Sequence, residues 1–308
     1  MRRAASGLLA ALFALMAAAG AQAQTAAVGE VSASGDADHF GALRLRTGAL
    51  TGYASPFRYA GLALQTTRYT QSGWHSDAPA VLLLWRNQKR DTLAGTVAEA
   101  GVVRIEGRTR VIGDATWSLR PNAHTGIELL AASGLVETRR ALENATAHTF
   151  LGISAERQLG RRFTAIGLAG HQRFTDGNER VHLRARLIWL LVPEHGISAQ
   201  LRWRQFRSQQ LDVGGAYFNP ERYREWQAGL VMRKRHAGWI WYGMVAAGRE
   251  AIDGDRGRTT ALADVRAEGG LGKRAHLILN ASYNRSAGFG TAERYWYRVI
   301  GVTVMVPF

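Results

Sequence analysis

The 308-residue sequence contains no cysteine. Such a chain has no disulfide to form in an oxidising compartment, and it offers no cysteine for lipid attachment after a signal peptide. Beyond residue 23, no apolar run reaches the roughly 20 residues that a membrane-spanning helix requires. If the chain lies in a membrane, it must therefore cross as a closed β-barrel, which hydrogen-bonds every backbone group within the sheet.

Acidic residues are few relative to basic ones. The sequence has 39 Lys and Arg against 24 Asp and Glu, a formal net charge of +15, and removing Arg2 and Arg3 leaves 15 − 2 = +13. Such a charge suits binding to nucleic acid, contact with the phosphates of lipopolysaccharide, or a lumen that passes anionic or strongly hydrated solutes. We expect no nucleic-acid partner, because an exported protein seldom meets one.

The amino terminus indicates export from the cytoplasm. Two arginines precede an apolar run over residues 8–19, and residues 21–23 form a small-x-small cleavage pattern. This order predicts a cleaved Sec-type signal peptide over residues 1–23 and a mature domain over residues 24–308. A membrane anchor fits less well, because the apolar run is short and stands directly before the cleavage site.

The stretch Tyr295–Phe308 alternates with period two and ends on an aromatic residue. One face is purely aliphatic, with Ile300, Val302, Val304 and Val306, which predicts a strand and not a helix. An outer-membrane barrel needs such apolar rows toward lipid and aromatics at the two interfaces. We predict that this stretch closes a barrel and that Phe308 is the signal read by the barrel-assembly machinery.

The rest of the chain shows the same alternation, with about one strand every 15–20 residues. Turn lengths alternate between short segments near 120–124, 159–162, 192–196, 236–238 and 271–274 and longer ones at 133–146, 208–222, 250–257 and 286–294. This is the asymmetry of short periplasmic turns and long external loops. We predict an all-β, transmembrane, antiparallel up-and-down barrel of 16 strands, with 14 as the alternative. A soluble antiparallel barrel would also alternate, but it would need one very large sheet with an Arg- and Glu-rich second face.

Several local assignments accompany this prediction. Residues 24–38 are expected to be a weak first strand or a lead-in, and residues 52–56 and 73–79 are expected to be a turn and a loop. Residues 104–119 alternate without interruption and predict a single long strand. The polar segment 137–147 is expected to contain a helical turn.

Arginines stand on the rows opposite the aliphatic ones. A bare arginine facing lipid at mid-depth costs about 2–4 kcal/mol, so these rows are expected to face inward. Glu106, Asp114 and Glu128 are candidates to pair with some of them. The lumen is then polar and net positive, either as a path that grips a passing polymer or anion weakly, or as a ladder that rigidifies a narrow barrel. The predicted lumen-lining residues are Arg44, Arg46, Arg104, Arg108, Arg110, Arg184, Arg186, Arg202, Arg204 and Arg233.

Two segments, Tyr53–Tyr59 and Tyr217–Tyr223, share the pattern Tyr-x-(Ser/Asn)-Pro-x-Arg-Tyr. Asn or Ser before Pro initiates a turn, and the tyrosines anchor the start of a strand at an interface. Two turns of similar chemistry would account for the repetition. If the terminal strand ends at the periplasmic rim, the second segment lies at the external mouth; its motif residues are Tyr217, Phe218, Asn219, Pro220, Arg222 and Tyr223.

The segment 215–223 also resembles the aromatic-(Ser/Asn)-Pro-x-x-Tyr signature of barrel domains in bacterial exopolysaccharide export proteins. These are the outer-membrane barrel of the cellulose-synthase operon, the poly-N-acetylglucosamine export porin and the YaiO family. The resemblance covers residues 52–308 by strand rhythm, but only this motif is specific. It implies export of an exopolysaccharide. The exporters carry a long tetratricopeptide scaffold, whereas this sequence shows no helical repeat of period 34, so we expect a separate periplasmic scaffold protein.

Catalysis is not expected. The nine histidines are scattered, and none stands in a Ser/His/Asn or Asp/His arrangement that would activate a nucleophile. No metal-ligand spacing or phosphate-binding loop is present, so no cofactor and no metal are predicted.

The sequence therefore predicts a positively charged passage in the outer membrane of a Gram-negative bacterium, in contact with lipid and lipopolysaccharide. Its expected cargo is an exopolysaccharide. A general or anion-selective porin is the first alternative, and a structural barrel that anchors a periplasmic partner is the second.

Overall fold

The computed structural model describes residues 25–210, 212–255, 257–272, 275–286 and 295–308. The predicted signal peptide, residues 1–23, lies outside the described residues, as does most of the predicted loop 286–294. The described chain is almost entirely β-strand, with one helical turn, α2 (Arg139–Glu143), and one 3₁₀ turn, η1 (Pro193–His195). Among these residues, no helix is long and apolar enough to cross a membrane.

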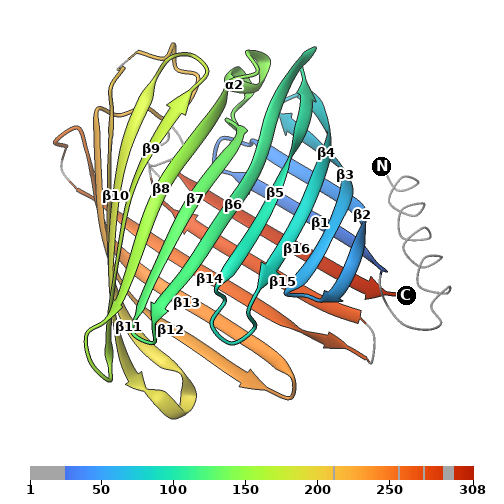
Figure 1. The fold of residues 1–308 in the computed structure, drawn as a ribbon. Helices are drawn as coiled ribbons and strands as arrows, with labels where there is room; N and C mark the ends of the chain where they lie inside the picture. The colour runs from blue at the N-terminus through green and yellow to red at the C-terminus, as the bar shows by residue number, and fades with distance from the viewer. Residues whose placement is uncertain (1–24, 211, 256, 273–274, 287–294) are drawn as a thin grey trace.

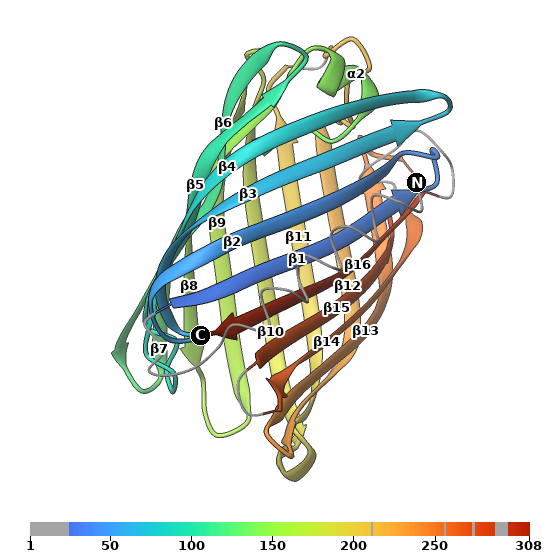
Figure 2. The ribbon, with the colours of Figure 1, turned by 90° about the vertical axis from the view of Figure 1, so that its right-hand side faces the viewer.

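Sixteen strands form one closed antiparallel barrel (Figures 1 and 2), which confirms the predicted fold and strand number. Each strand pairs with its sequence neighbours, and β1 pairs with β16 to close the sheet. The strands are β1 (Thr25–Asp36), β2 (Gly41–Ser55), β3 (Arg58–Gln71), β4 (Trp74–Gln88), β5 (Gly95–Ile105), β6 (Arg108–Asn122), β7 (Thr125–Leu135), β8 (Ala147–Gln158), β9 (Phe163–Phe174), β10 (Glu179–Val192), β11 (Ile197–Ser208), β12 (Arg222–His236), β13 (Trp239–Ile252), β14 (Arg258–Leu271), β15 (Ala275–Arg285) and β16 (Trp296–Pro307).

Alternate residues of each strand point out of the barrel, and these are predominantly apolar. On β4, Val81, Leu83 and Trp85 are exposed, whereas the alternate residues Ala80 and Leu82 are buried. Similar exposed apolar rows occur on β3, β8, β12 and β16. A soluble sheet buries its apolar face, so a belt of outward Leu, Val, Ile and Trp side chains identifies the surface that meets lipid.

The two ends of the barrel differ in their connections. At one end, here the turn end, strands are joined by short segments, including Pro56–Phe57, Ala123–His124 and Ala237–Gly238. At the other, here the loop end, lie the longer connections over residues 136–146 and 209–221. From residue 120 onward, the predicted short segments lie at the turn end and the predicted long segments lie at the loop end. For the described residues, this confirms the predicted difference between the two ends.

Residues 104–119 do not form the single strand that their alternation predicts. β5 ends at Ile105, and β6 begins at Arg108 after a two-residue turn at Glu106 and Gly107. Both residues have positive φ, 45° and 72°, which is the conformation of the tight hairpin turns whose twist matches paired strands. Ile105 and Arg108 are register partners, so the inward residues are odd-numbered on β5 and even-numbered on β6. Polar and apolar residues still alternate across the turn because the outward Arg104 is polar, so periodicity alone could not locate the break.

Two other local predictions need correction. The chain reverses at Ser72 and Gly73, both with positive φ, so residues 74–79 of the predicted loop belong to β4. β2 continues to Ser55, so the turn predicted across residues 52–56 lies at Pro56–Phe57. Of the two alternatives for the amino-terminal segment, the structure shows the strand: β1 pairs along its length with both β2 and β16.

The closing pair joins the two ends of the sheet. Register partners run from Ala26–Pro307 to Asp36–Tyr297, and the Phe308 N–H donates to the Thr25 carbonyl at 3.1 Å. The backbone of β16 is therefore satisfied on both sides, as a strand in hydrocarbon requires.

Candidate functional site: the lumen and its loop-end mouth

Nine of the ten predicted lumen arginines lie on inward-facing rows. Arg44 and Arg46 extend from β2, Arg108 and Arg110 from β6, and the others from β10, β11 and β12. Arg104 is the exception. Its neighbours Val103 and Ile105 pack in an interior cluster with Phe40 and Tyr69, so Arg104 points outward with Val102. The prediction for Arg104 was wrong because it assumed one strand through the Glu106–Gly107 turn. Arg104 instead lies at the outer rim of the loop end.

The charges of Arg44 and Arg46 are largely compensated. Arg46 lies 2.9 Å from Glu99 and 3.4 Å from Glu30, and it also donates to Gln65. Arg44 contacts Glu137 at 2.9 Å. All of these side chains except Glu30 line a cavity of 160 Å³. This side of the lumen is an ordered ion-pair network and not a free positive surface.

The carboxylates predicted to pair with arginines do not do so in the described structure. Glu106 accepts from the Ser76 hydroxyl at 2.7 Å, and Glu128 accepts from the Ser118 hydroxyl at 3.2 Å. Asp114 faces the same cavity as Arg44 and Arg46 without an ion pair among the described residues. The arginines pair with Glu99 and Glu225 on other strands and with Glu137 in a loop.

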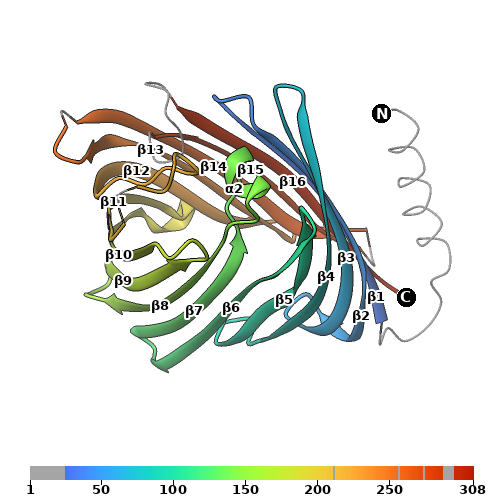
Figure 3. The same ribbon diagram turned by 90° about the horizontal axis from the view of Figure 1, so that it is seen from above.

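The segment Val136–Thr146, here the mouth bridge, folds into the opening at the loop end. It contains α2, which lies within the barrel outline when viewed from above (Figure 3). Leu142 is fully buried against Phe40, Tyr69 and Ile105 on one wall. Ala141 packs with Phe174 and Tyr217 on the opposite side.

Polar contacts fix the mouth bridge to both sides. Thr138 caps α2 by accepting from the Ala141 N–H, and its hydroxyl donates to the Ala216 carbonyl. From the wall, Arg108 and Arg110 donate to the carbonyls of Asn144 and Ala145 at 3.2 and 2.8 Å. Two of the predicted lumen arginines therefore bind the backbone of the mouth bridge. The mouth bridge therefore spans the opening, with anchors on β2, β3, β6 and the 209–221 loop.

The predicted mouth motif lies at the loop end and turns toward the interior. Tyr217 stacks on Phe174 with ring centres 4.8 Å apart, and its hydroxyl donates to Asp176 at 2.8 Å. Burial raises the pKa of the Tyr217 phenol above its ordinary value. Arg180 lies over the rings of Phe174, Phe206 and Tyr217 at 4.8, 5.0 and 5.3 Å. Its guanidinium also donates to Ser208 and Asn219, both at 3.1 Å, so in the described part of the chain cation–π contacts and neutral acceptors hold it without an ion pair.

Asn219 and Pro220 shape this loop. Asn219 accepts from Asn178 at 2.8 Å and from Arg180 at 3.1 Å, and it donates to the Gln210 carbonyl at 2.6 Å. Pro220 is buried, and Phe218 meets Phe206 and Tyr223 edge to face. Arg222 is exposed, and its backbone N–H donates to Asp253. The motif residues therefore order the loop, and Arg222 alone of the six projects away from it.

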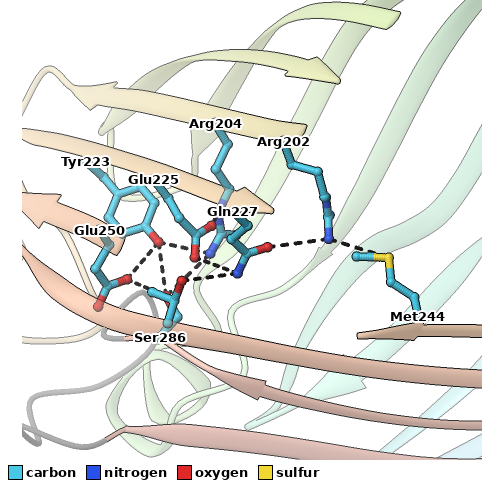
Figure 4. A network of polar contacts seen from close by, with 9 residues as sticks. Arg202, Arg204, Tyr223, Glu225, Gln227, Met244, Glu250 and Ser286 are labelled. Carbon is cyan, nitrogen blue, oxygen red and sulfur yellow. Dashed lines mark hydrogen bonds and ion pairs between the residues drawn. The ribbon is translucent and has the colours of Figure 1, made fainter. Parts of the chain in front are cut away.

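Tyr223, the last motif residue, is fully buried in a polar network (Figure 4). Its hydroxyl receives a hydrogen bond from Arg204 at 2.9 Å and donates to Glu250 at 2.9 Å. Ser286 donates to Glu250 at 2.6 Å, and Arg204 forms an ion pair with Glu225. The network joins β11, β12 and β13 just below the mouth. The earlier copy of the motif has no such role, because Tyr53 and Tyr59 stack on each other at the turn end, 6.4 Å apart.

Below this network, four predicted arginines face one another on β10 and β11. Arg184 is the register partner of Arg204, and Arg186 is the register partner of Arg202. All four line a cavity of 290 Å³, which also has Glu128, Ser154, Glu225 and Gln227 in its wall.

A larger cavity of 940 Å³ opens toward the turn end. It is strongly basic, since the two acidic residues Asp91 and Glu268 accompany six arginines: Arg86, Arg90, Arg120, Arg233, Arg235 and Arg266. Of these six arginines, Arg233 is the one that the sequence analysis predicted to line the lumen. Within the residues that the structure describes, no group of three or more His, Asp or Glu side chains could hold a metal ion.

Sequence reasoning missed several interior residues. Glu137 and Arg180 lie at or beyond strand ends, where alternation gives no direction, and their partners come from distant strands. For Glu225 and Glu250, by contrast, the alternation of β12 and β13 does indicate that the side chains face inward. Alternation could not show that these two buried carboxylates serve Arg204 and Tyr223.

No protein-family model matches the chain, and no curated protein matches it in sequence. Among solved structures, it is similar to a bacterial polysaccharide outer membrane secretin, with a TM-score of 0.66 and 10% identity over 94% of this chain and all of that one. CdiB from Acinetobacter baumannii gives 0.47, with 12% identity over 94% of this chain and 61% of that one. OprD from Pseudomonas aeruginosa gives 0.45, with 12% identity over 92% and 94%. At these identities the first likeness describes the fold alone, and the other two scores are too low to add to it. The chain has the fold of an outer-membrane β-barrel.

Proposed function

We propose that this barrel lies in the outer membrane with its loop end outward, and that it exports an exopolysaccharide delivered by a separate periplasmic partner. The observation that carries the proposal is the distribution of arginines along the interior. Six line the cavity at the turn end, four face one another higher on β10 and β11, and Arg180 lies near the mouth. A hydrated, anionic chain would meet donors at successive depths and be held weakly at each, as continuous passage requires.

Two further observations support this proposal. The fold is similar to that of a polysaccharide outer membrane secretin over nearly the whole chain. The mouth is spanned by a bridge anchored on both sides, which suits a passage that stays covered until a polymer arrives. The secretin's cargo is a property of that protein, and its assignment here is part of the proposal.

The proposal is tested by deleting the gene and measuring cell-surface polysaccharide, with the wild-type gene supplied in trans as the control. We expect surface glycan to fall while periplasmic glycan accumulates. Unchanged surface glycan would refute export. In planar bilayers, the purified barrel is expected to be mostly closed. A large, steady conductance that small anions block would favour a porin instead.

An anion-selective porin remains the second candidate, because the same arginines would favour small anions. The reversal potential in a salt gradient, measured on the open barrel, reports anion preference directly. If the open barrel strongly prefers anions and the deletion strain has normal surface glycan, the protein is an anion-selective porin.

A further inference from the structure

The four arginines on β10 and β11, here the arginine quartet, place like charges opposite one another across two paired strands. Arg184 and Arg186 stand directly opposite Arg204 and Arg202 in the strand register, with all four side chains on the inward face. Like charges directly opposite on neighbouring strands destabilise a sheet.

Neighbouring groups compensate this repulsion only in part. Arg204 forms an ion pair with Glu225 and bonds to Tyr223. Among the described residues, Arg202 donates to the Gln227 amide oxygen at 3.5 Å and to the Met244 sulfur at 3.8 Å. Within the described parts of the chain, no carboxylate forms an ion pair with Arg184, Arg186 or Arg202. The contrast with Arg46, which has two glutamate partners, shows that this barrel neutralises inward arginines elsewhere.

The space beside the quartet is shaped for a small polar group. The cavity measures 290 Å³, near the lower limit of roughly 300–1,000 Å³ that is usual for small-molecule sites. Ser154 and Gln227 supply a hydroxyl and an amide to its wall, and Ile166 and Leu168 supply an apolar surface. Glu128 and Glu225 also line it, so four guanidinium groups face two carboxylates.

We propose that the arginine quartet is a lumen subsite for an oxyanion group, a carboxylate or a phosphate, carried by a saccharide. This rests on the proposed function, because it names the chemical class of the exported polymer. Guanidinium forks bind such groups through two parallel N–H···O bonds, and among the described residues neither Arg184 nor Arg186 is engaged in an ion pair, although Glu128 and Glu225 line the same cavity. Ser154 and Gln227 would bond sugar hydroxyls, while Glu225 keeps Arg204 in place. Both kinds of oxyanion fit, so the test compares them.

The test measures binding to the detergent-solubilised full-length barrel by isothermal titration calorimetry. The probes are trigalacturonate for a carboxylate, glucose 1-phosphate for a phosphate and cellotriose as the neutral control. We expect one or both anionic probes to bind more tightly than cellotriose. We expect Arg184→Gln/Arg186→Gln to weaken anionic binding about tenfold or more, which corresponds to about 1.4 kcal/mol, and to leave cellotriose unchanged. The matched control is Arg224→Gln, which removes an exposed arginine on the outward face of β12 and should change nothing.

Arg186→Lys separates charge from geometry, because it keeps the charge but loses the fork, and we expect an intermediate loss. Equal affinity of the wild type for cellotriose and both anionic probes would overturn the subsite, and so would unchanged anionic binding in the double variant. If the double variant does not fold, the wild-type comparison and Arg186→Lys still decide the question. If binding depends on these arginines but surface glycan is normal in the deletion strain, export is refuted and the oxyanion subsite still stands. Export that is abolished by gene deletion but unaffected by the double variant would refute the subsite alone.

Discussion

The mouth bridge gives the most direct test of whether this barrel is held closed. Leu142 is its principal apolar anchor, with an exposed fraction of 0% and contacts to residues of the wall such as Phe40, Tyr69 and Ile105. Truncating a buried leucine to alanine costs about 2–5 kcal/mol, from lost burial and the cavity that remains. A loss of about 3 kcal/mol changes the equilibrium between docked and undocked bridge by a little over a hundredfold.

We therefore expect Leu142→Ala to raise the open fraction of single channels in planar bilayers by up to this factor. The barrel wall is intact in the variant, so its heat-modifiable mobility on an unboiled gel should match that of the wild type. Limited proteolysis within residues 136–146 provides an independent measure of undocking and should become faster. The matched control is Glu143→Ala, which removes only the exposed, surface ion pair with Arg139 and is expected to have little effect.

Faster proteolysis without any change in conductance would refute the reasoning, because the bridge would then undock without having limited passage. Unchanged proteolysis would show instead that the polar contacts of Thr138, Arg108 and Arg110 hold the bridge without Leu142.

Two further predictions concern stability, measured as the urea midpoint of folding into liposomes by tryptophan fluorescence. Leu83→Arg places a charge on the lipid face near the middle of β4, where Leu83 is 62% exposed, and should destabilise the barrel by about 2–4 kcal/mol. The same change at Leu93, in the turn beyond β4, should be nearly neutral, and equal effects would contradict the assigned lipid belt. Tyr223→Phe removes one buried hydrogen bond from each of Arg204 and Glu250, which keep Glu225 and Ser286 as partners, and should cost about 1–3 kcal/mol. Tyr283→Phe, on the outward face, is its control, and a loss as large there would show that the network is not responsible.

The fold could be predicted largely from the sequence because a barrel in lipid imposes one rule on every strand. Outward residues such as Leu83 and Ile300 must be apolar, so alternation identified most of the strands, and the even number of strands in such barrels set the predicted count at 16. The failures occurred at tight turns. Ser72–Gly73 and Glu106–Gly107 reverse the chain in two residues, and each turn changes whether odd- or even-numbered residues face inward. The residue types give no sign of this change, so the strand limits were missed and Arg104 was assigned to the wrong face.

The lumen could be predicted only as a set of rows. Alternation correctly placed Arg184, Arg186, Arg202 and Arg204 inside, but it carries no information about register. That Arg184 stands opposite Arg204 depends on the length of the β10–β11 turn and on the irregularity between Leu190 and Val192. The mouth bridge was anticipated only as a helical turn. Its position across the opening depends on contacts between residues far apart in sequence, which no local pattern encodes.

The β1–β16 pairing has a consequence for how the molecule forms. Every other strand pairing joins sequence neighbours and can form as a local hairpin, whereas this one joins segments from opposite ends of the described sheet. Pairing at such long sequence separation is slow, because the loss of chain entropy precedes the gain from contact. Until it forms, β1 and β16 each present a row of unpaired N–H and C=O groups, which readily pair with other chains. The step from open sheet to closed barrel is therefore when this chain is most exposed to mispairing, and it depends on the register that begins at Ala26 and Pro307.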